Sequence, residues 1–248
     1  MRTLGIIPIK AASEKNFRVL GHQNLIEWTV GAAMYSRLDK TVAAIDTLDG
    51  PYLDKLDGTF PVHLGAYATP LKLIQGVLAL EKEKPDGIVY LQVTSPLRSA
   101  EDIDACIDML YEGRPAPAPE GGVRGAKLDT EDWLLERRYR KTPEHNLRTV
   151  MSVTQAEDLH PGHMYWDDGH FMSRPVSPRH EWGNRQSLQP KAFYRNGAIY
   201  AATTEAIERH TLRSSWCRPY VMPPERSVNI DTEWDWRMAE WLVGNTQH

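Results

Sequence analysis

Residues 87–98 read Gly-Ile-Val-Tyr-Leu-Gln-Val-Thr-Ser-Pro-Leu-Arg, an apolar run that ends in a polar loop. The run from Gly87 to Val93 predicts a strand buried on both faces, as in a parallel sheet. Ser99 follows the loop and can cap a helix with Asp102 as its capping-box partner. The inner stripe of that helix is apolar and consists of Ile103, Cys106, Ile107 and Leu110. This succession of strand, polar loop and helix is typical of an α/β fold.

The same order of apolar run and amphipathic segment recurs along the chain. Short apolar runs predict further strands at 4–7, 42–45, 60–64, 149–153 and 196–202. Helical spacing predicts helices at 25–34 and from Thr69-Pro70 onward. A last helix is expected to bury Trp234, Met238, Trp241 and Leu242. The fold class is therefore α/β, with a mostly parallel sheet covered by helices on both faces.

Composition narrows the classes of protein that the chain can belong to. Its 248 residues are 41% hydrophobic and 25% charged, which argues against intrinsic disorder. A formal net charge of -4 disfavours nucleic acid as the main partner. Cys106 and Cys217 are the only cysteines, so no disulfide framework is expected, and Cys106 falls in a packing stripe. No apolar run approaches a membrane span and the start lacks signal-peptide character, so we expect a cytoplasmic enzyme or binding domain.

Polar residues follow the first predicted strand. Lys10, Ser13, Lys15 and Asn16 combine cations with hydroxyl and amide groups, which suits a polyphosphate. The stretch is not a P-loop, because no glycine-rich run ends in Lys-Ser or Lys-Thr. Taken alone, it is more typical of a solvated turn.

A second polar loop follows the strand at 87–93. Gln92, Thr94, Ser95 and Arg98 lie where an open α/β sheet binds its ligand, and Arg98 offers a planar fork for an anion. The hydroxyl groups could equally satisfy loop amides, and the pattern alone leaves both interpretations open. Because the carboxyl ends of parallel strands share one edge, we expect the loops at 10–16, 46–49 and 92–98 to meet there.

Asp231 lies just before the last predicted helix. Thr232 can cap that helix with Asp235 as capping-box partner, which explains Asp235 but not Asp231. A carboxylate at a strand end suits Mg²⁺, which prefers a few hard oxygens. Histidines 160, 163, 170 and 180 lie near several aspartates, but their Pro- and Gly-rich context favours a surface loop over a zinc site.

Together these segments resemble the acylneuraminate cytidylyltransferases, the CMP-sugar synthetases. The matching stretches read Ile-Ile-Pro-Ile-Lys-Ala-Ala-Ser at 6–13, Leu-Gln-Val-Thr-Ser-Pro-Leu-Arg at 91–98, Tyr-Arg-Asn-Gly-Ala-Ile-Tyr at 194–200 and Asn-Ile-Asp-Thr-Glu-Trp-Asp-Trp at 229–236. Arg185 and Lys191 precede the third stretch and resemble the family's sugar-side segment. The family usually has Arg-Gly-Gly-Ser-Lys in the first stretch and a second aspartate where this chain has Asn229.

The resemblance implies a GT-A-like, Rossmann-like nucleotidyltransferase that works as a homodimer. It would transfer CMP from CTP to an acidic sugar of the sialic type and release pyrophosphate, with Mg²⁺ as cofactor. Residues 1–248 would form a single domain, with 113–148 an atypical insertion or flexible segment and about 149–195 a substrate or dimerisation subdomain.

The resemblance also assigns roles to individual residues. Catalysis would rest on Lys10, Lys15 and Asp231. The nucleotide would be bound by Lys10, Ser13, Lys15, Asn16, Gln92, Thr94, Ser95 and Arg98. The acceptor would face Gln92, Arg185, Lys191 and Asn196. The metal would be held by Asp231, with weaker contributions from Asn229 and Asp235. Three alternatives stay open: another acceptor such as a phosphonate, another nucleoside triphosphate, and a catalytically silent nucleotide-binding relative.

Overall fold

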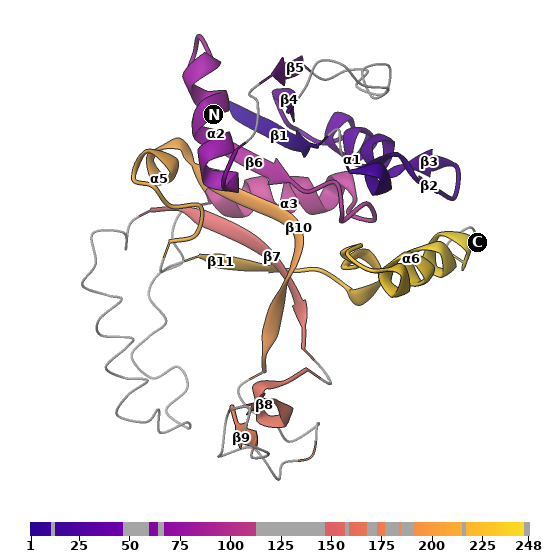
Figure 1. Cartoon of the computed structure of the whole chain (residues 1–248). Helices are drawn as coiled ribbons and strands as arrows, with labels where there is room; N and C mark the ends of the chain where they lie inside the picture. Colours follow the sequence, from indigo (N-terminus) through magenta and orange to yellow (C-terminus); the bar gives the residue numbers. More distant parts are fainter. Residues whose placement is uncertain are drawn as a thin grey trace, which may run out of the picture.

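The computed structural model describes residues 1–10, 13–46, 60–63, 67–112, 147–156, 159–167, 173–176, 184, 191–214 and 217–245. This part of the chain is built on one seven-stranded sheet, in the order β11-β7-β10-β6-β1-β4-β5 (Figure 1). Its strands are β1 (Thr3–Ile9), β4 (Lys40–Ile45), β5 (Phe60–His63), β6 (Gly87–Leu91), β7 (Thr149–Gln155), β10 (Phe193–Thr203) and β11 (Arg218–Val221).

The sheet is mostly parallel, as the sequence predicts. β1 runs parallel to β4 and β6, β4 parallel to β5, and β11 parallel to β7. Only β10 is reversed, since it pairs antiparallel with both β6 and β7. The carboxyl ends of β1 and β6 consequently lie at the same edge, and the polar loops that follow them start there.

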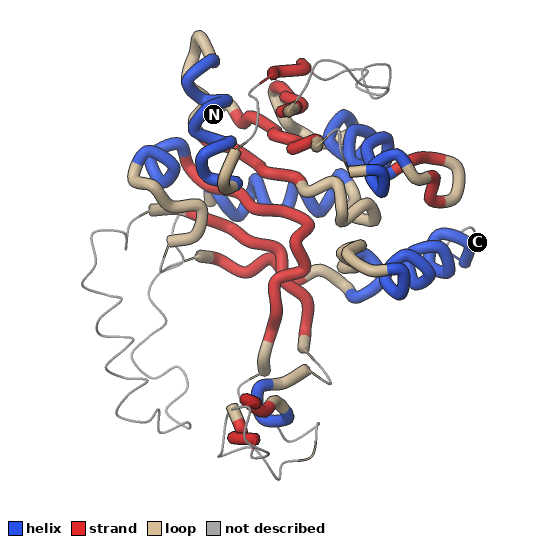
Figure 2. The backbone as a smooth tube through the Cα atoms, in the orientation of Figure 1, coloured by secondary structure: helices blue, strands red, loops and turns tan. Residues whose placement is uncertain are grey.

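Helices cover both faces of the sheet, which confirms the predicted architecture. One apolar cluster joins the sheet to α1 (Leu25–Met34), α3 (Ala100–Tyr111) and α6 (Glu233–Asn245). A second cluster joins it to α2 (Pro70–Leu80) and α5 (Thr204–Glu208). Short 3-10 turns are η1 (Glu14–Phe17), η4 (Pro161–His163) and η7 (Pro224–Arg226). Figure 2 shows these helices alongside the strands of the sheet.

Helix starts follow their local sequence signals. Ser99 and Asp102 form the expected capping box, with the Ser99 amide donating to Asp102 Oδ2 at 2.9 Å. Thr69 Oγ1 accepts from the Lys72 amide at 3.3 Å, ahead of Pro70 in the first turn of α2. The inner stripe of α3 is buried as predicted, and burial raises the pKa of the Cys106 thiol above its ordinary value. Cys106 is therefore a packing residue.

The buried face of α6 differs from the prediction. Trp234, Met238 and Trp241 were expected in the core but are 69%, 42% and 66% exposed. The residues that are buried instead are Trp236, Ala239 and Val243. Because tryptophans lie on both faces of this helix, the apolar spacing predicted burial of the face that is in fact exposed. The ring of Trp236 lies 3.9 Å from the Arg18 guanidinium, a long-range contact that helps to orient the helix.

The far halves of β7 and β10 extend away from the sheet as a two-stranded arm (Figure 1). A small hairpin of β8 (Tyr165–Asp167) and β9 (Ser173–Pro175) lies at its end, and a second hairpin of β2 (Val19–Leu20) and β3 (Gln23–Asn24) precedes α1. Nearly all of the predicted insertion at 113–148 lies outside the described residues, and the domain division stays a prediction. Among the helices described, none is long and apolar enough to cross a membrane.

Candidate active site

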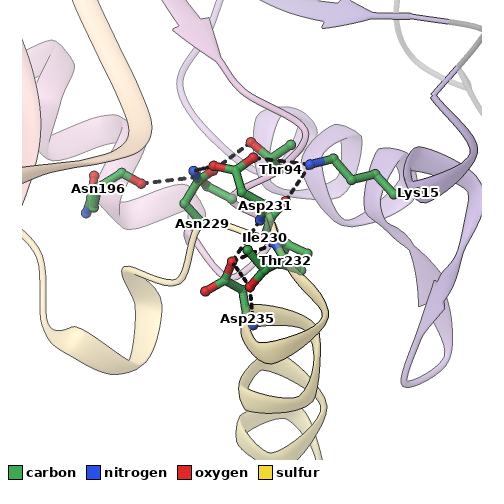
Figure 3. Close-up of polar contacts among 9 residues, drawn as sticks. Lys15, Thr94, Asn196, Asn229, Ile230, Asp231, Thr232 and Asp235 are labelled. Atoms are coloured by element: carbon green, nitrogen blue, oxygen red, sulfur yellow. Dashed lines mark hydrogen bonds and ion pairs between the residues drawn. The ribbon is translucent and has the colours of Figure 1, made fainter.

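Three segments that are distant in sequence meet beside the carboxyl ends of β1 and β6. The amide of Ile230 donates to the carbonyl of Thr94 at 2.7 Å, which ties the loop after β6 to the segment before α6. Lys15 Nζ donates to the carbonyl of Ile230 at 2.7 Å and so brings in the loop after β1 (Figure 3). The prediction that the loops at 10–16 and 92–98 meet is confirmed, whereas 47–49 lie outside the described residues.

Lys15 forms an ion pair with Asp231. Its Nζ lies 3.2 Å from Asp231 Oδ1, and the two side chains are 35% and 63% exposed. The pair is therefore open to solvent, where Coulomb attraction is weak and a multiply charged ligand can compete with it. A cation and an anion are thus available side by side at the edge of the sheet.

Asn229 links Asp231 to the loop after β6. Its Oδ1 accepts from Thr94 Oγ1 at 2.7 Å and lies 3.3 Å from Ser95 Oγ. Its Nδ2 donates to Asp231 Oδ2 at 2.5 Å. Ser95 is fully buried, so the Asn229 oxygen faces inward while the Asp231 carboxylate faces solvent (Figure 3).

Asp235 serves the helix start, as its capping-box spacing predicts. Its Oδ2 accepts from the amides of Thr232 and Asp231 at 2.7 and 3.0 Å, and Thr232 Oγ1 accepts from the Asp235 amide at 3.2 Å. Burial raises the pKa of Asp235, but the bonds from Thr232 and Asp231 outweigh it, so the pKa lies below its ordinary value. The Asp235 carboxylate is thus used to accept hydrogen bonds from backbone amides at the start of α6.

The side chains at this edge fit Mg²⁺ as a site with a single protein carboxylate, Asp231. The described residues contain no group of three or more His, Cys, Asp or Glu that could hold a metal ion by themselves. Mg²⁺ commonly binds through one or two carboxylates, with substrate phosphates and water completing its shell. Its exposure leaves the Asp231 carboxylate open to such an arrangement.

The loop after β1 is held by its own polar groups. The Ser13 amide donates to the carbonyl of Lys10 at 3.2 Å, and buried Asn16 donates from Nδ2 to the same carbonyl at 3.3 Å. The Lys10 side chain is exposed. Of the four residues predicted to hold a triphosphate here, the lysines present charge to solvent, while Asn16 shapes the turn.

Arg98 was expected to present its guanidinium to an anion, but its side chain is buried within the loop. It is 3% exposed and donates to the carbonyl of Gln92, and burial lowers its pKa to about 9. Among the residues that the structure describes, its Nε and Nη1 have no hydrogen-bond partner. In this structure Arg98 therefore braces the loop from within and does not reach the exposed edge.

A glycine in β10 brings the reversed strand close to Gln92. The pairing of β10 with β7 is irregular between Arg195 and Tyr200, and Gly197 has φ +78° there. A Cβ on Gly197 would lie 2.8 Å from Gln92 Oε1 and 3.5 Å from Asn229 Cγ. The positive φ therefore favours glycine, and a Cβ at this position would require the Gln92 side chain to shift.

The residues predicted to face the acceptor do not gather at this edge. Asn196 is 2% exposed, and its side chain is used internally, accepting from Ser152 Oγ at 2.6 Å and donating to Ser227 Oγ at 3.0 Å. Lys191 is exposed two residues before β10. Arg185 lies outside the described residues. Among the described members of this group, Gln92 lies beside Gly197, and Asn196 reaches the edge through its carbonyl, which accepts from Ser95 Oγ at 3.3 Å.

An ion pair between Arg226 and the buried side chain of Asp102 was not predicted from the sequence. It supports the segment that leads to Asn229. Arg226 donates from Nε and Nη2 to the two oxygens of Asp102, at 2.8 and 2.9 Å, and Tyr220 Oη donates to Oδ1 at 2.8 Å. Burial raises the pKa of Asp102, but the bonds from Arg226, the Ser99 amide and Tyr220 outweigh it, so the pKa lies below its ordinary value. This pair fixes the segment leading to Asn229 against the start of α3.

Arg18, a further cation of the loop after β1, has contacts that the sequence did not predict. It pairs with Glu233 and covers Trp236, thereby attaching the loop after β1 to the first turn of α6. Among the histidines, His160 is buried and its Nδ1 accepts from the Gly162 amide at 3.0 Å, so it is not a surface residue as predicted. His163 is exposed, and His170 and His180 lie outside the described residues.

The mostly parallel α/β sheet of this chain, with Lys15 and Asp231 at its carboxyl edge, has the fold of solved synthetase and synthase structures. Solved structures share this fold over 98% of the chain. A CMP:2-keto-3-deoxy-manno-octonic acid synthetase complexed with CTP matches with a TM-score of 0.60 at 13% identity, over 99% of its own chain. The 4-diphosphocytidyl-2C-methyl-D-erythritol synthase of Anaerococcus prevotii matches with a TM-score of 0.62 at 11% identity, over 97% of its chain.

Sequence comparison finds a relative over most of the chain. The N-acylneuraminate cytidylyltransferase B of Danio rerio is 26% identical over 236 residues, which cover 92% of this chain. This similarity agrees with the resemblance drawn from the motifs. The chain spans about half the length of this curated relative, 47%. No protein-family model matches the chain.

Proposed function

We propose that this protein is a Mg²⁺-dependent cytidylyltransferase that transfers CMP from CTP to an acidic sugar of the sialic type and releases pyrophosphate. The observation that carries the proposal is the meeting of Lys15, Thr94 and Asp231 at one edge of the sheet, from three segments far apart in sequence. The relative with similar sequence is named for the same type of transfer.

The proposed reaction needs positioning and charge neutralisation more than covalent chemistry by the protein. An oxygen of the acceptor forms a bond to the α-phosphorus of CTP, while the bond from that phosphorus to the bridging oxygen of pyrophosphate breaks. Lys10 and Lys15 bind the triphosphate, and the Lys15 ammonium leaves its solvent-exposed pair with Asp231 to do so. When bound at Asp231, Mg²⁺ would neutralise phosphate charge and stabilise the leaving group.

The acceptor side of the proposal rests on fewer contacts. Gln92 lies beside Gly197 and is half-exposed, so its amide can donate to an acceptor hydroxyl. A cation is needed for the acceptor carboxylate, and Arg185 and Lys191 are the residues that the family resemblance supplies for it. Their position relative to Gln92 is part of the proposal.

Pyrophosphate release tests the proposal. Purified protein with Mg²⁺ is offered each of the four nucleoside triphosphates with sialic-type acids, other keto-deoxy sugar acids and phosphonates. We expect release only with CTP and a sugar acid. Release with a phosphonate or another triphosphate would support a nucleotidyltransferase with a different substrate. CTP binding without pyrophosphate release would favour the alternative that the protein is a catalytically silent nucleotide-binding relative.

Two variants locate the chemistry. Asp231→Ala is expected to abolish pyrophosphate release and leave the far-ultraviolet circular dichroism unchanged, because this carboxylate is exposed. Asp108→Ala is the matched control, since Asp108 is an exposed, ion-paired carboxylate on α3. Near-full activity in Asp231→Ala would remove this residue from the site.

A further inference from the structure

Asn229 and Asp231 have different roles at the proposed cation site. This inference rests on the proposed function, because it concerns the same site. The sequence suggested that both residues ligate the metal. The described hydrogen bonds of the Asn229 side chain indicate a different role. They join it to Thr94, Ser95 and Asp231.

The orientation of the Asn229 amide follows from its neighbours. A carboxylate oxygen accepts hydrogen bonds, so the group that lies 2.5 Å from Asp231 Oδ2 must be the amide nitrogen. The amide oxygen is then fixed on the opposite side, toward Thr94 Oγ1 at 2.7 Å and Ser95 Oγ at 3.3 Å. The single proton of Ser95 is shared with the carbonyl of Asn196, also at 3.3 Å, so Thr94 is the main donor.

This orientation turns the only oxygen of the Asn229 side chain away from solvent. A cation bound at the exposed Asp231 carboxylate would face the amide nitrogen of Asn229, which is a donor and has no lone pair to offer. Rotating the amide would place its oxygen against the carboxylate and leave the Thr94 hydroxyl facing a nitrogen. The Thr94 hydroxyl can accept from that nitrogen, but the bond to Asp231 would be lost and two oxygens would repel each other there.

We infer that Asn229 is a positioning residue that fixes the Asp231 carboxylate to the loop after β6, and that Asp231 alone supplies side-chain oxygen to the cation. The Asn229 amide donates to Asp231 Oδ2 and accepts from Thr94, so it joins the carboxylate to the loop after β6.

Thermal unfolding with and without metal tests this inference separately from turnover. Wild type, Asn229→Asp and the control Asn245→Asp are unfolded in EDTA and in millimolar Mg²⁺, without nucleotide. Asn245 is a suitable control because it is exposed and its side chain donates to the carbonyl of Trp241 in α6 at 2.7 Å. Asn229→Asp sets two carboxylates against each other, so its Tm in EDTA should fall by roughly 5 °C and recover in Mg²⁺.

The wild type and the control should shift by less than about 1 °C on adding Mg²⁺, because a single exposed carboxylate binds the metal weakly. Asn229→Asp should also bind Mn²⁺ at least about tenfold more tightly than the wild type in calorimetry, since cation affinity rises with ligand charge. A wild type that gains as much from Mg²⁺ as Asn229→Asp, or an Asn229→Asp protein that keeps the wild-type Tm in EDTA, would overturn the inference.

A second variant decides the matter if Asn229→Asp does not fold. Thr94→Val removes the main donor to the Asn229 oxygen, and its Tm should fall by the same amount in EDTA and in Mg²⁺. An unchanged Tm would show that the oxygen is not held inward. Because these readouts use metal alone, they stand even if no acid supports pyrophosphate release, and a failure here leaves the transferase proposal intact.

Discussion

Lys15 is the residue on which the proposed nucleotide binding depends most directly. Its Nζ is held by the Ile230 carbonyl and Asp231, so the ammonium is already oriented at the edge of the sheet. An oriented cation forms charge-assisted bonds to phosphate that are about twice as strong as neutral ones.

Lys15→Ala should therefore weaken CTP affinity by about tenfold or more, the loss of one such bond. Isothermal titration calorimetry measures this directly. Lys84→Ala is the control, because Lys84 is 71% exposed and pairs with Glu208. Equal CTP affinity in the two variants would assign Lys15 to the surface and not to the site.

Gly197 gives a second prediction for a single residue. Gly197→Ala should destabilise the protein by about 1–2 kcal/mol, because its φ of +78° is unfavourable for alanine and its Cβ would meet Gln92 Oε1. Urea unfolding of Gly197→Ala and Gly244→Ala provides the comparison. Gly244 is in α6 with nothing within 4 Å of its added Cβ, so alanine there should be neutral or stabilising. Equal effects would remove the steric argument.

Among the elements, the contact between α3 and η7 supports the site. The Asp102 side chain is fully buried, while that of Arg226 is 41% exposed. Breaking a buried pair leaves an uncompensated charge, but partial exposure of Arg226 reduces the cost. The segment from Arg226 to Asp231 depends on this anchor for its position.

Arg226→Met should lower the free energy of unfolding at pH 7 by about 2 kcal/mol. The pKa of Asp102 is lowered in the folded state, so its contribution is present above the ordinary pKa and is lost as pH falls through the folded value. The difference between wild type and Arg226→Met should accordingly shrink in urea titrations at about pH 3. Arg209→Met, which breaks an exposed pair with Glu205, should cost less than about 0.5 kcal/mol. A difference that persists unchanged in acid would contradict this account.

Sequence signals such as capping residues and apolar spacing predicted the helices and strands well. The features that were not predicted depend on contacts between residues far apart in the sequence. The cap at Ser99 and the buried stripe of α3 follow from neighbours in sequence, so they could be predicted. The pairing of Asp102 with Arg226 spans 124 residues, and capping had already explained Asp102. The burial of Arg98 and Asn196 likewise depends on loops and strands that only the folded chain brings together. Residue type therefore indicated which segments form the candidate site, but it did not separate exposed groups from supporting ones.

For the whole molecule, the arm formed by β7 and β10 exposes a group of aromatic side chains. Phe193, Tyr194, Tyr165 and Trp166 are 42%, 45%, 47% and 61% exposed on the arm and its terminal hairpin. Exposed aromatic clusters of this kind often mark interaction surfaces. Their position supports the proposal that the protein works as a homodimer and that this arm takes part.

Sedimentation velocity should then give about twice the 28.2 kDa of one chain. Trp166→Glu should shift the protein toward monomer, because it places a charge in the apolar contact. Trp241→Glu, at a similarly exposed position on α6, should leave the dimer intact. A monomeric wild type, or dissociation caused only by the α6 variant, would refute this assignment.

The central claim is that distant segments meet to hold a magnesium-bound triphosphate at one edge of the sheet. Calorimetric titration of CTP into wild type and Asp231→Ala, each with and without Mg²⁺, tests it most directly. The account predicts that Mg²⁺ strengthens CTP binding to the wild type and that Asp231→Ala loses this dependence. The same Mg²⁺ dependence in both proteins, or none in the wild type, would contradict it.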